Sequence, residues 1–577
     1  MPDARRVRQV WLASSVLGLL LGLGHATWQF SVESGQVIAG LVTYPPSNPF
    51  YVYHLKLWTL VVQLSGLLLR AGMSEIAVSY AISGLLGLVS ISALALVVYA
   101  LTEDRAVSLL APFFIHLTPA PQYGVGYPIW LFGVSHTYGV LGLAFDLLVL
   151  ALLGCGRYGA GLLLLGLAPA VHPSLGAWLW LLVGAVVLAD AASRRALLPH
   201  WRWIAAGTAV TAVSALVQLW GLRGAAHAAV DVKPYFDAFV RDWDAHRQPI
   251  DLGHHGLWVG LGTGAIALLW RRAFAHEVPE PARFLLSALG AGSAAAVALL
   301  LVSLAGLEHL PRALLVLMPN RLVNIDVLAS TAVLIALLSK PRGGRWTSAG
   351  LLVLLAGLLL AHRSRYLELG RALGAGSAPW ERLHVLVTAA ALLVVAARWS
   401  MRRGSEGVPA PRDPVRLVSL AILASAPVLA FVLAVQQPRE LKDRTNNRVF
   451  ADLARGDGVI APAAGLSLVQ LRTRRPIILD ATGLDMLPYA WEAAPEMARI
   501  LDGVYGIDFF RPPNEARHTA MIPFAHNRAV WEERTNEDWK KVRRDFGVRQ
   551  VLAHRDWDLQ LPAGAANKDL LVYAIPD

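Results

Sequence analysis

The chain has 577 residues, of which 55% are hydrophobic, and its formal net charge is +11. Its apolar runs repeatedly approach the roughly 20 residues that cross a bilayer, which excludes an ordinary soluble protein. The arginines stand in short clusters between these runs, as in the cytoplasmic loops of membrane proteins, and this placement argues against nucleic acid as a partner. The single cysteine, Cys155, excludes a disulfide framework.

The N-terminal segment predicts an uncleaved first span. Arg5, Arg6 and Arg8 precede an apolar run at about 9–28, and no small-residue cleavage site stands out. These arginines place the N-terminus in the cytoplasm. The abundance of Ala, Gly, Leu and Arg favours a bacterial origin, so we expect a multi-pass protein of the bacterial inner (plasma) membrane.

Residues 54–71 decide the rest of the topology. If this segment spans the membrane, later arginine clusters such as Arg194/Arg195 and Arg271/Arg272 fall outside the cell. If it forms a pair of interfacial or re-entrant helices, every such cluster falls inside, as the positive-inside rule favours. We therefore expect residues 29–76 to form one long external loop.

Twelve further spans follow on this count, so the chain is predicted to have about thirteen, with its C-terminus outside the cytoplasm. Pro112 and Pro169 lie within two short spans, which we expect to be broken or tilted. The loop at 223–253 is amphipathic and is expected to be helical along the surface. The predicted spans after the first are 77–101, 107–120, 134–153, 159–171, 174–192, 203–222, 254–270, 283–306, 321–339, 347–362, 382–398 and 415–436.

Residues 437–577 differ in kind, because their charge rises and their apolar runs shorten. The runs VIAPA, RPIILD, RQVLAH and LLVYAIP predict strands, and AWEAAPEMARILDGVYG and NEDWKKVRRDFG predict helices. We expect a membrane domain at 1–436 and an extracytoplasmic α/β domain at 437–577, which is a normal domain size.

The order of features near the N-terminus carries a resemblance. Glu33 follows the first span, YPPSNPFYVYH occupies 44–54, and LLLRAGMSEIAVSYAISGLLGL at 67–88 places a Gly-x-Ser-Glu element before the second span. The turn TEDRA at 102–106 also fits. This order resembles the GT-C superfamily of membrane glycosyltransferases, in particular bacterial members that use polyprenyl-phosphate sugars, with an architecture like that of aminoarabinose transferases and protein mannosyltransferases. The likeness covers the first 120 residues at motif level and the remainder as architecture.

The resemblance implies inverting transfer of a hexosyl or pentosyl group from a polyprenyl-phosphate donor to an extracytoplasmic glycan, lipid or protein. Glu33 would be the catalytic general base that takes the proton of the acceptor hydroxyl. Fixed positive charge would stabilise the phosphate leaving group, and membrane lipids would be further partners. Many members pair two acids in this loop, whereas Glu33 is alone, so we assign no metal ligands. A divalent ion, Mg or Mn, remains open as a cofactor.

Three side chains are candidates for contact with the donor phosphate: Lys56, His172 and Arg321. Lys56 could instead extend to lipid headgroups, and His172 could instead cap a helix. Arg321 begins a span, where the helix dipole disfavours a cation. A bound anion explains it, and the alternative is an ion pair with Asp326 or Glu308.

Four further residues are expected to line the substrate cavity: Tyr44, His54, Tyr127 and His136. His136 falls at the predicted external boundary beside Tyr127, where ionisable groups usually face a bundle interior or a wet cavity. Tyr44 and His54 belong to the Pro-Pro-aromatic stretch of the first loop. No HExxH or Cys-His spacing predicts a zinc site.

Two other functions stay open. A non-catalytic scaffold of the GT-C fold, with the tail binding a partner, would account for the lone acid. A lipid or solute transporter would be expected to show inverted repeats and intramembrane acids; no repeat is evident, and Asp146 is the clearest acid within a span.

Overall fold

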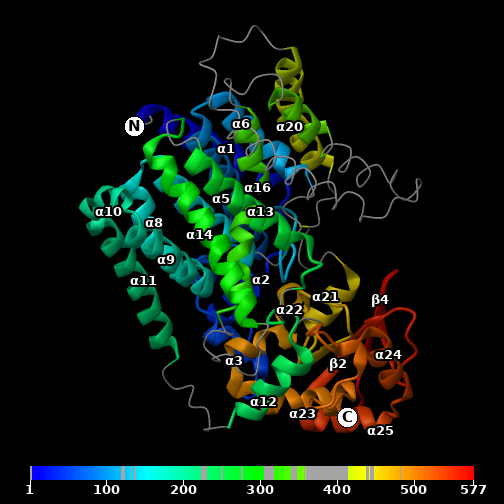
Figure 1. Cartoon of the computed structure of the whole chain (residues 1–577). Coiled ribbons are helices and arrows are strands. Elements are labelled where there is room, and N and C mark those ends of the chain that lie inside the picture. Colours follow the sequence, from blue (N-terminus) through cyan, green and yellow to red (C-terminus); the bar gives the residue numbers. More distant parts are fainter. Residues whose placement is uncertain are drawn as a thin grey trace. The chain divides into compact units, whose positions relative to one another are not determined.

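The computed structural model is mostly helical, with a small sheet near the C-terminus (Figure 1). It divides into two compact units. The helical unit contains residues 1–26, 81–213 and 249–438, and the mixed unit contains residues 27–80, 214–248 and 439–577. The described residues are 3–118, 124–129, 131–135, 138–222, 231–248, 251–273, 277–303, 317–339, 347–356, 358, 414–436, 441, 447–480 and 483–577.

The helical unit contains the predicted apolar segments as helices. Within the described ranges, every predicted span overlaps a helix; the segment 382–398 lies outside them. Two helices of this unit, α5 and α11, continue into the mixed unit. The unit's labelled helices are α1 (Ala4–Gly24), α5 (Glu75–Thr102), α6 (Arg105–His116), α7 (Tyr138–Gly154), α8 (Tyr158–Val171), α9 (Pro173–Ala189), α10 (Ala191–Leu197), η2 (Leu198–His200), α11 (Trp201–Gly221), α13 (His255–Ala273), α14 (Glu280–Ser303), η5 (Pro319–Leu322), α16 (Val323–Leu338) and α20 (Pro414–Gln436). A further apolar helix spans Thr347–Ala356.

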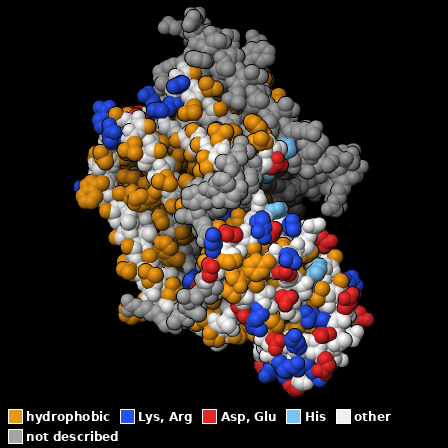
Figure 2. Space-filling view, turned by 60° about the horizontal axis from the view of Figure 1, so that its bottom comes forward, with side chains coloured by type: hydrophobic (Ala, Val, Ile, Leu, Met, Phe, Trp, Pro, Cys, Tyr) orange, Lys and Arg blue, Asp and Glu red, His pale blue; other side chains and the backbone are white. Residues whose placement is uncertain are grey.

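Five helices of the described part are long and apolar enough to cross a membrane. They are Ala4–Gly24, Glu75–Thr102, Ala191–Gly221, Glu280–Val302 and Val415–Val435. On the face shown in Figure 2, hydrophobic side chains cover much of the described part of the helical unit, and the C-terminal segment shows Lys, Arg, Asp and Glu interspersed. These features are those of a membrane-embedded helical protein.

The centre of the helical unit is α16, all of whose residues are buried. It packs against α6, α7, α13 and α14. Small residues allow some helices to approach closely, as is typical of helix packing in membranes. For example, a side chain at Gly87 of α5 would collide with the backbone of α1 at Gly18.

The mixed unit gathers three segments that are predicted to lie outside the membrane: the whole first loop, most of the loop after α11, and the tail. Its sheet has the strand order β1-β2-β4-β3, with β1 parallel to β2 and the other pairs antiparallel. Its strands are β1 (Val459–Pro462), β2 (Val548–His554), β3 (Ala563–Ala566) and β4 (Leu570–Ala574). Its helices are α2 (Phe30–Ile38), α3 (Pro49–Lys56), α4 (Leu60–Arg70), α12 (Lys233–Ala238), η3 (Phe239–Trp243), α21 (Arg448–Arg455), α22 (Val469–Thr473), η7 (Gly483–Tyr489), η8 (Trp491–Ala493), α23 (Ala494–Tyr505), η9 (Asn514–Ala516), α24 (Phe524–Glu533) and α25 (Asn536–Phe546).

The segment at 54–71 is not one straight helix. Helices α3 and α4 meet at an angle of 102°. Asn48 caps the start of α3 and Thr59 caps the start of α4, so each helix has its own N-terminus. This geometry fits the topology in which the segment does not cross the membrane as a single helix.

The tail contains three of the four predicted strands and both predicted helices. The prediction of a strand at RPIILD was wrong, because that segment forms only an isolated bridge between Ile477 and Ile460. One of its edges pairs with β1, where Ile478 N–H donates to the Ile460 carbonyl at 2.8 Å. Its other edge is bonded to side chains of the first loop, described below, instead of to another strand.

Candidate functional site

Glu33 lies in the first turn of α2, and its side chain is only 5% exposed. Helix α2 is buried because α4 packs closely against it. At this contact a side chain at Gly35 would collide with Ser65, and a side chain at Gly66 would collide with Ile38. The absence of side chains at these two positions lets the helices approach and keeps the Glu33 carboxyl away from solvent.

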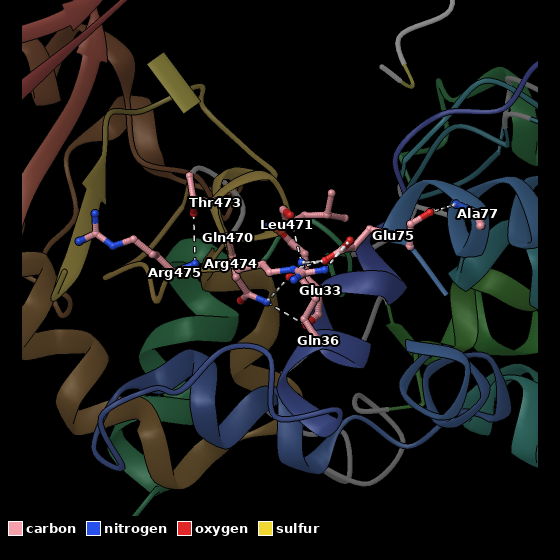
Figure 3. A network of polar contacts seen from close by, with 10 residues as sticks. Glu33, Gln36, Glu75, Ala77, Gln470, Leu471, Thr473, Arg474 and Arg475 are labelled. Atoms are coloured by element: carbon pink, nitrogen blue, oxygen red, sulfur yellow. Dashed lines mark hydrogen bonds and ion pairs between the residues drawn. The ribbon is translucent and has the colours of Figure 1, made fainter. Parts of the chain in front are cut away.

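The short helix α22 of the tail covers Glu33 (Figure 3). Leu471 N–H donates to Glu33 Oε1 at 3.2 Å, and Gln470 Nε2 donates to the Glu33 carbonyl at 2.8 Å. The tail therefore contacts both the backbone and the carboxyl group of the predicted base.

Gln470 is the centre of a buried network of hydrogen bonds. Its Oε1 accepts from the Tyr44 hydroxyl at 2.7 Å and lies 3.0 Å from His54 Nε2. Since an amide oxygen only accepts, His54 Nε2 carries the proton in this arrangement. A neutral ring then leaves Nδ1 to accept from the Ser34 hydroxyl, 2.9 Å away.

Side chains of the Pro-Pro stretch at 44–54 form hydrogen bonds with the backbone of RPIILD at 475–480, the segment that was predicted to be a strand. Ile477 N–H donates to the Tyr44 hydroxyl at 3.3 Å, and Asn48 Nδ2 donates to the Ile477 carbonyl at 3.0 Å. Both side chains are buried. These bonds satisfy backbone groups that would otherwise require a neighbouring strand.

An ion pair joins α22 to the start of α5. Arg474 Nε and Nη2 donate to Glu75 Oε1 and Oε2 at 2.6 and 3.0 Å, which is the bidentate arrangement of a strong charge-assisted pair. Gln36 Nε2 also donates to Glu75 Oε1 at 3.0 Å. The same network thus fixes α2, α5 and α22 to one another (Figure 3).

Helix α22 is bounded at each end by a strained residue. Leu468 has φ of 60° and Arg474 has φ of 55°, a left-handed conformation that side chains other than Gly, Asn and Asp rarely adopt. Each such residue costs of order 1–3 kcal/mol and persists only where surrounding contacts impose it. The contacts of Gln470 and Arg474 are those that hold α22 here.

The Glu33 carboxyl has a pKa raised to about 8. Burial is the main cause, the negative charge of Asp480 adds to it, and the hydrogen bond from Leu471 N–H opposes it. Burial likewise raises the pKa of Tyr44 well above its usual range, so its hydroxyl stays protonated and donates to Gln470. A carboxyl with such a pKa can exchange a proton near neutral pH.

Asp480 is a second buried acid of this site, 2% exposed, that sequence reasoning missed. Its charge acts on Glu33 and on Tyr44. Asp480 lies in the tail, far from Glu33 in the sequence, so Glu33 stands alone among the acids of its own loop segment. The one local signal for Asp480 is its position at the end of an apolar run, RPIILD.

The predicted site residues fall into separate groups. Glu33, Tyr44 and His54 lie together in the network around Gln470. Lys56 forms an ion pair with Glu492, so its charge is already compensated. His136 lies outside the described residues.

The remaining candidates belong to the helical unit. The Arg321 guanidinium lies over the Tyr127 ring, 4.6 Å from its centre, and close enough to His172 for an electrostatic interaction. Arg321 has no ion pair with a described residue. Its predicted partner Asp326 accepts a hydrogen bond from Ser293 Oγ at 2.8 Å. Glu308, its other predicted partner, lies outside the described ranges.

His172 caps a helix, as its alternative interpretation proposed. Its Nδ1 accepts from Leu175 N–H at the start of α9, at 3.3 Å. The loop that carries Tyr127 is fixed by Asn324, whose side chain bonds both the N–H and the carbonyl of Val125 at 2.7 and 2.9 Å.

No group of three or more His, Cys, Asp and Glu side chains that could hold a metal ion is found among the described residues. No protein-family model matches the chain, and no curated protein matches it either.

Proposed function

We propose that the chain is a GT-C-like glycosyltransferase of the bacterial inner membrane, which moves a sugar from a polyprenyl-phosphate donor to an extracytoplasmic acceptor. The observation that carries the proposal is the buried Glu33 carboxyl, whose pKa of about 8 suits a general base. The apolar helices support a membrane location for such a lipid-linked donor. About thirteen spans, an internal N-terminus and an external C-terminus complete the proposal.

In this reaction the acceptor oxygen bonds to the anomeric carbon as the bond from that carbon to the phosphate oxygen breaks. Glu33, once ionised, takes the acceptor proton, and polyprenyl phosphate leaves with the bonding electrons. Inversion at the anomeric carbon follows from a single displacement. Arg321, which has no ion pair with any described residue, is proposed to bind phosphate, and Lys56 is a weaker candidate because Glu492 pairs with it.

The test is transfer by the purified protein in proteoliposomes supplied with radiolabelled polyprenyl-phosphate hexoses and pentoses and with an envelope extract as acceptor. Loss of a general base typically costs 10²–10⁴-fold in rate. We expect a loss of at least about 100-fold for Glu33→Gln, with unchanged folding. The matched control is Glu496→Gln, which replaces a carboxylate paired with Arg499 in the same unit. Full activity of Glu33→Gln contradicts the proposal.

One observation favours a second function. The Glu33 carboxyl is already bonded to Leu471 N–H and covered by α22, as expected of a residue that anchors the tail to the first loop. In that case the protein is a non-catalytic scaffold. Glu33→Gln would then leave the cellular phenotype intact, whereas substitutions on the exposed surface of 439–577 would abolish it.

A further inference from the structure

The junction between α3 and α4 is attached to the end of α11. Trp58 Nε1 donates to Ser214 Oγ at 3.0 Å, and Ser214 Oγ in turn donates to Gln63 Oε1 at 2.6 Å. Gln63 Nε2 donates back to the Ser214 carbonyl at 2.9 Å. Gln218 Nε2, one turn further along α11, donates to the Leu55 carbonyl.

The position of Ser214 along α11 gives the depth of this attachment. The helical stretch 191–221 is long and apolar enough to cross a membrane, and only 11% of its apolar part is buried within the protein. Ser214 precedes Gly221 by seven residues, which is about 10 Å at 1.5 Å per residue. Trp220, 70% exposed at that end, is of the type enriched at membrane interfaces. The attachment therefore lies well inside the apolar length of α11.

Helix α4 has two different faces. Val61, Val62 and Leu69 are buried, and this side packs against α2. Leu64 and Leu67 point outward and are 50% and 60% exposed. Large leucines at this exposure, beside an α11 that is itself apolar and exposed, form a surface suited to hydrocarbon.

The backbone at the bend also satisfies the requirement for a position inside the membrane. Non-helical backbone is tolerated at membrane depth only where protein buries it. Leu57 and Thr59 are 7% and 3% exposed, and the Thr59 hydroxyl accepts from Val62 N–H at 3.1 Å. Gln218 satisfies the Leu55 carbonyl at the end of α3.

We propose that α3 and α4 form a re-entrant pair in which α4 lies in the hydrocarbon of the outer leaflet, with Leu64 and Leu67 in contact with lipid acyl chains. This rests on the membrane location in the proposed function and not on glycosyl transfer. It decides between the interfacial and re-entrant alternatives for residues 54–71. Because α2 packs on the opposite face of α4, this arrangement places α4 between the Glu33 helix and lipid.

The chain suits a test by site-directed spin labelling, because its single cysteine, Cys155, is buried and can be replaced by Ala. Nitroxide labels would be placed at Leu64→Cys and Leu67→Cys in the full chain, reconstituted in nanodiscs of phosphatidylethanolamine and phosphatidylglycerol. Collision with oxygen reports hydrocarbon, and collision with a water-soluble nickel chelate reports water. Leu216→Cys on α11 is the membrane control, and Glu537→Cys on α25, whose side chain is 76% exposed, is the aqueous control.

We expect both α4 labels to match Leu216→Cys in oxygen accessibility and to be protected from nickel. If the nickel accessibility of the α4 labels is close to that of Glu537→Cys, or has an intermediate value typical of headgroups, the proposal that α4 is inserted in hydrocarbon is wrong. A triple substitution, Gln63→Leu, Ser214→Ala and Gln218→Leu, removes the side chains that form the attachment and should move the α4 labels toward the headgroups. If Leu216→Cys itself reports water, the membrane location fails. If the protein proves to have no transferase activity, the accessibilities of these labels are still expected to be the same.

Discussion

Gln470 and Glu33 are 437 positions apart in the sequence, yet the Gln470 side-chain amide donates to the Glu33 carbonyl at 2.8 Å. The oxygen of the Gln470 side-chain amide accepts hydrogen bonds from Tyr44 and His54. The predicted base is therefore positioned by the tail as much as by the loop that contains it, and most of the following predictions test that dependence.

The stability of the protein should fall as pH rises from about 4.5 to about 8, because folded Glu33 holds its proton more tightly than unfolded Glu33 does. This contribution is fully present below pH 4.5 and is lost as pH passes through the folded pKa. A shift of this size corresponds to at most about 5 kcal/mol. Thermal unfolding of the wild type and of Glu33→Gln from pH 5 to pH 9 measures it. Parallel pH curves for the two proteins would show that Glu33 titrates normally.

The transfer reaction should have the opposite pH dependence. A general base works in its ionised form, so kcat/KM should rise with pH up to the folded pKa of Glu33, about 8, and then level off. The measurement is the initial rate at low donor concentration from pH 5.5 to pH 9.5. A profile already flat above pH 5.5 would assign the proton transfer to another group.

Replacement of Asp480 by Asn should lower the pKa of Glu33, because it removes a negative charge that raises it. Burial, the larger cause, remains, so the pKa should stay above the ordinary value of a glutamate. Both the stability curve and the rate profile should shift to lower pH together. Asp569→Asn, an exposed carboxylate of the same unit, serves as control. An unchanged midpoint in Asp480→Asn would mean that the Asp480 charge does not reach Glu33.

Replacement of Gln470 by Leu should destabilise the mixed unit by about 2–4 kcal/mol, because several buried polar groups lose their partner at once. The affected groups are the Tyr44 hydroxyl, the His54 ring and the Glu33 carbonyl. Chemical unfolding followed by tryptophan fluorescence would measure the loss. Lys568→Ala, at an exposed position, should change stability by less than about 0.5 kcal/mol. Equal effects of both substitutions would exclude a central role for Gln470.

Replacement of Glu75 by Gln should loosen α22, because it removes the charge that Arg474 pairs with while the strain at Leu468 and Arg474 persists. We expect faster amide hydrogen exchange across residues 469–473, by about tenfold or more, since a tenfold change needs only about 1.4 kcal/mol. Mass spectrometry of peptic peptides would measure it. Glu496→Gln, which breaks an exposed pair within α23, should leave this peptide unchanged.

Much of the fold could be predicted because its signals are local. Apolar length determines a membrane helix, and the predicted spans overlap helices wherever the structure describes them. The bend between α3 and α4 also follows from a pattern, the distribution of arginines. Local sequence could not show that RPIILD does not form a regular strand. One edge of this segment forms hydrogen bonds with the side chains of Tyr44 and Asn48, which lie more than 400 positions earlier.

The candidate site was predicted only in part for the same reason. Glu33, Tyr44 and His54 stand close together in the first loop, where the order of an acid after the first span and a Pro-Pro-aromatic stretch indicated them. Gln470, Arg474 and Asp480 stand in an ordinary tail segment, and nothing near them in sequence indicates their partners. Their contribution arises from tertiary contacts, which one sequence does not reveal.

The contact between α22 and Glu33 sets an order on biosynthesis. The first loop leaves the ribosome long before the tail, so during most of translation Glu33 lacks Leu471, Gln470 and the burial they provide. Its carboxyl then lacks the charge of Asp480 and the cover of α22, so its pKa lies closer to the ordinary value of a glutamate. The buried, proton-retaining form of this residue can exist only after the last quarter of the chain has been made and has folded back onto the first loop, so a prematurely terminated product inserts its helices without acquiring that acid.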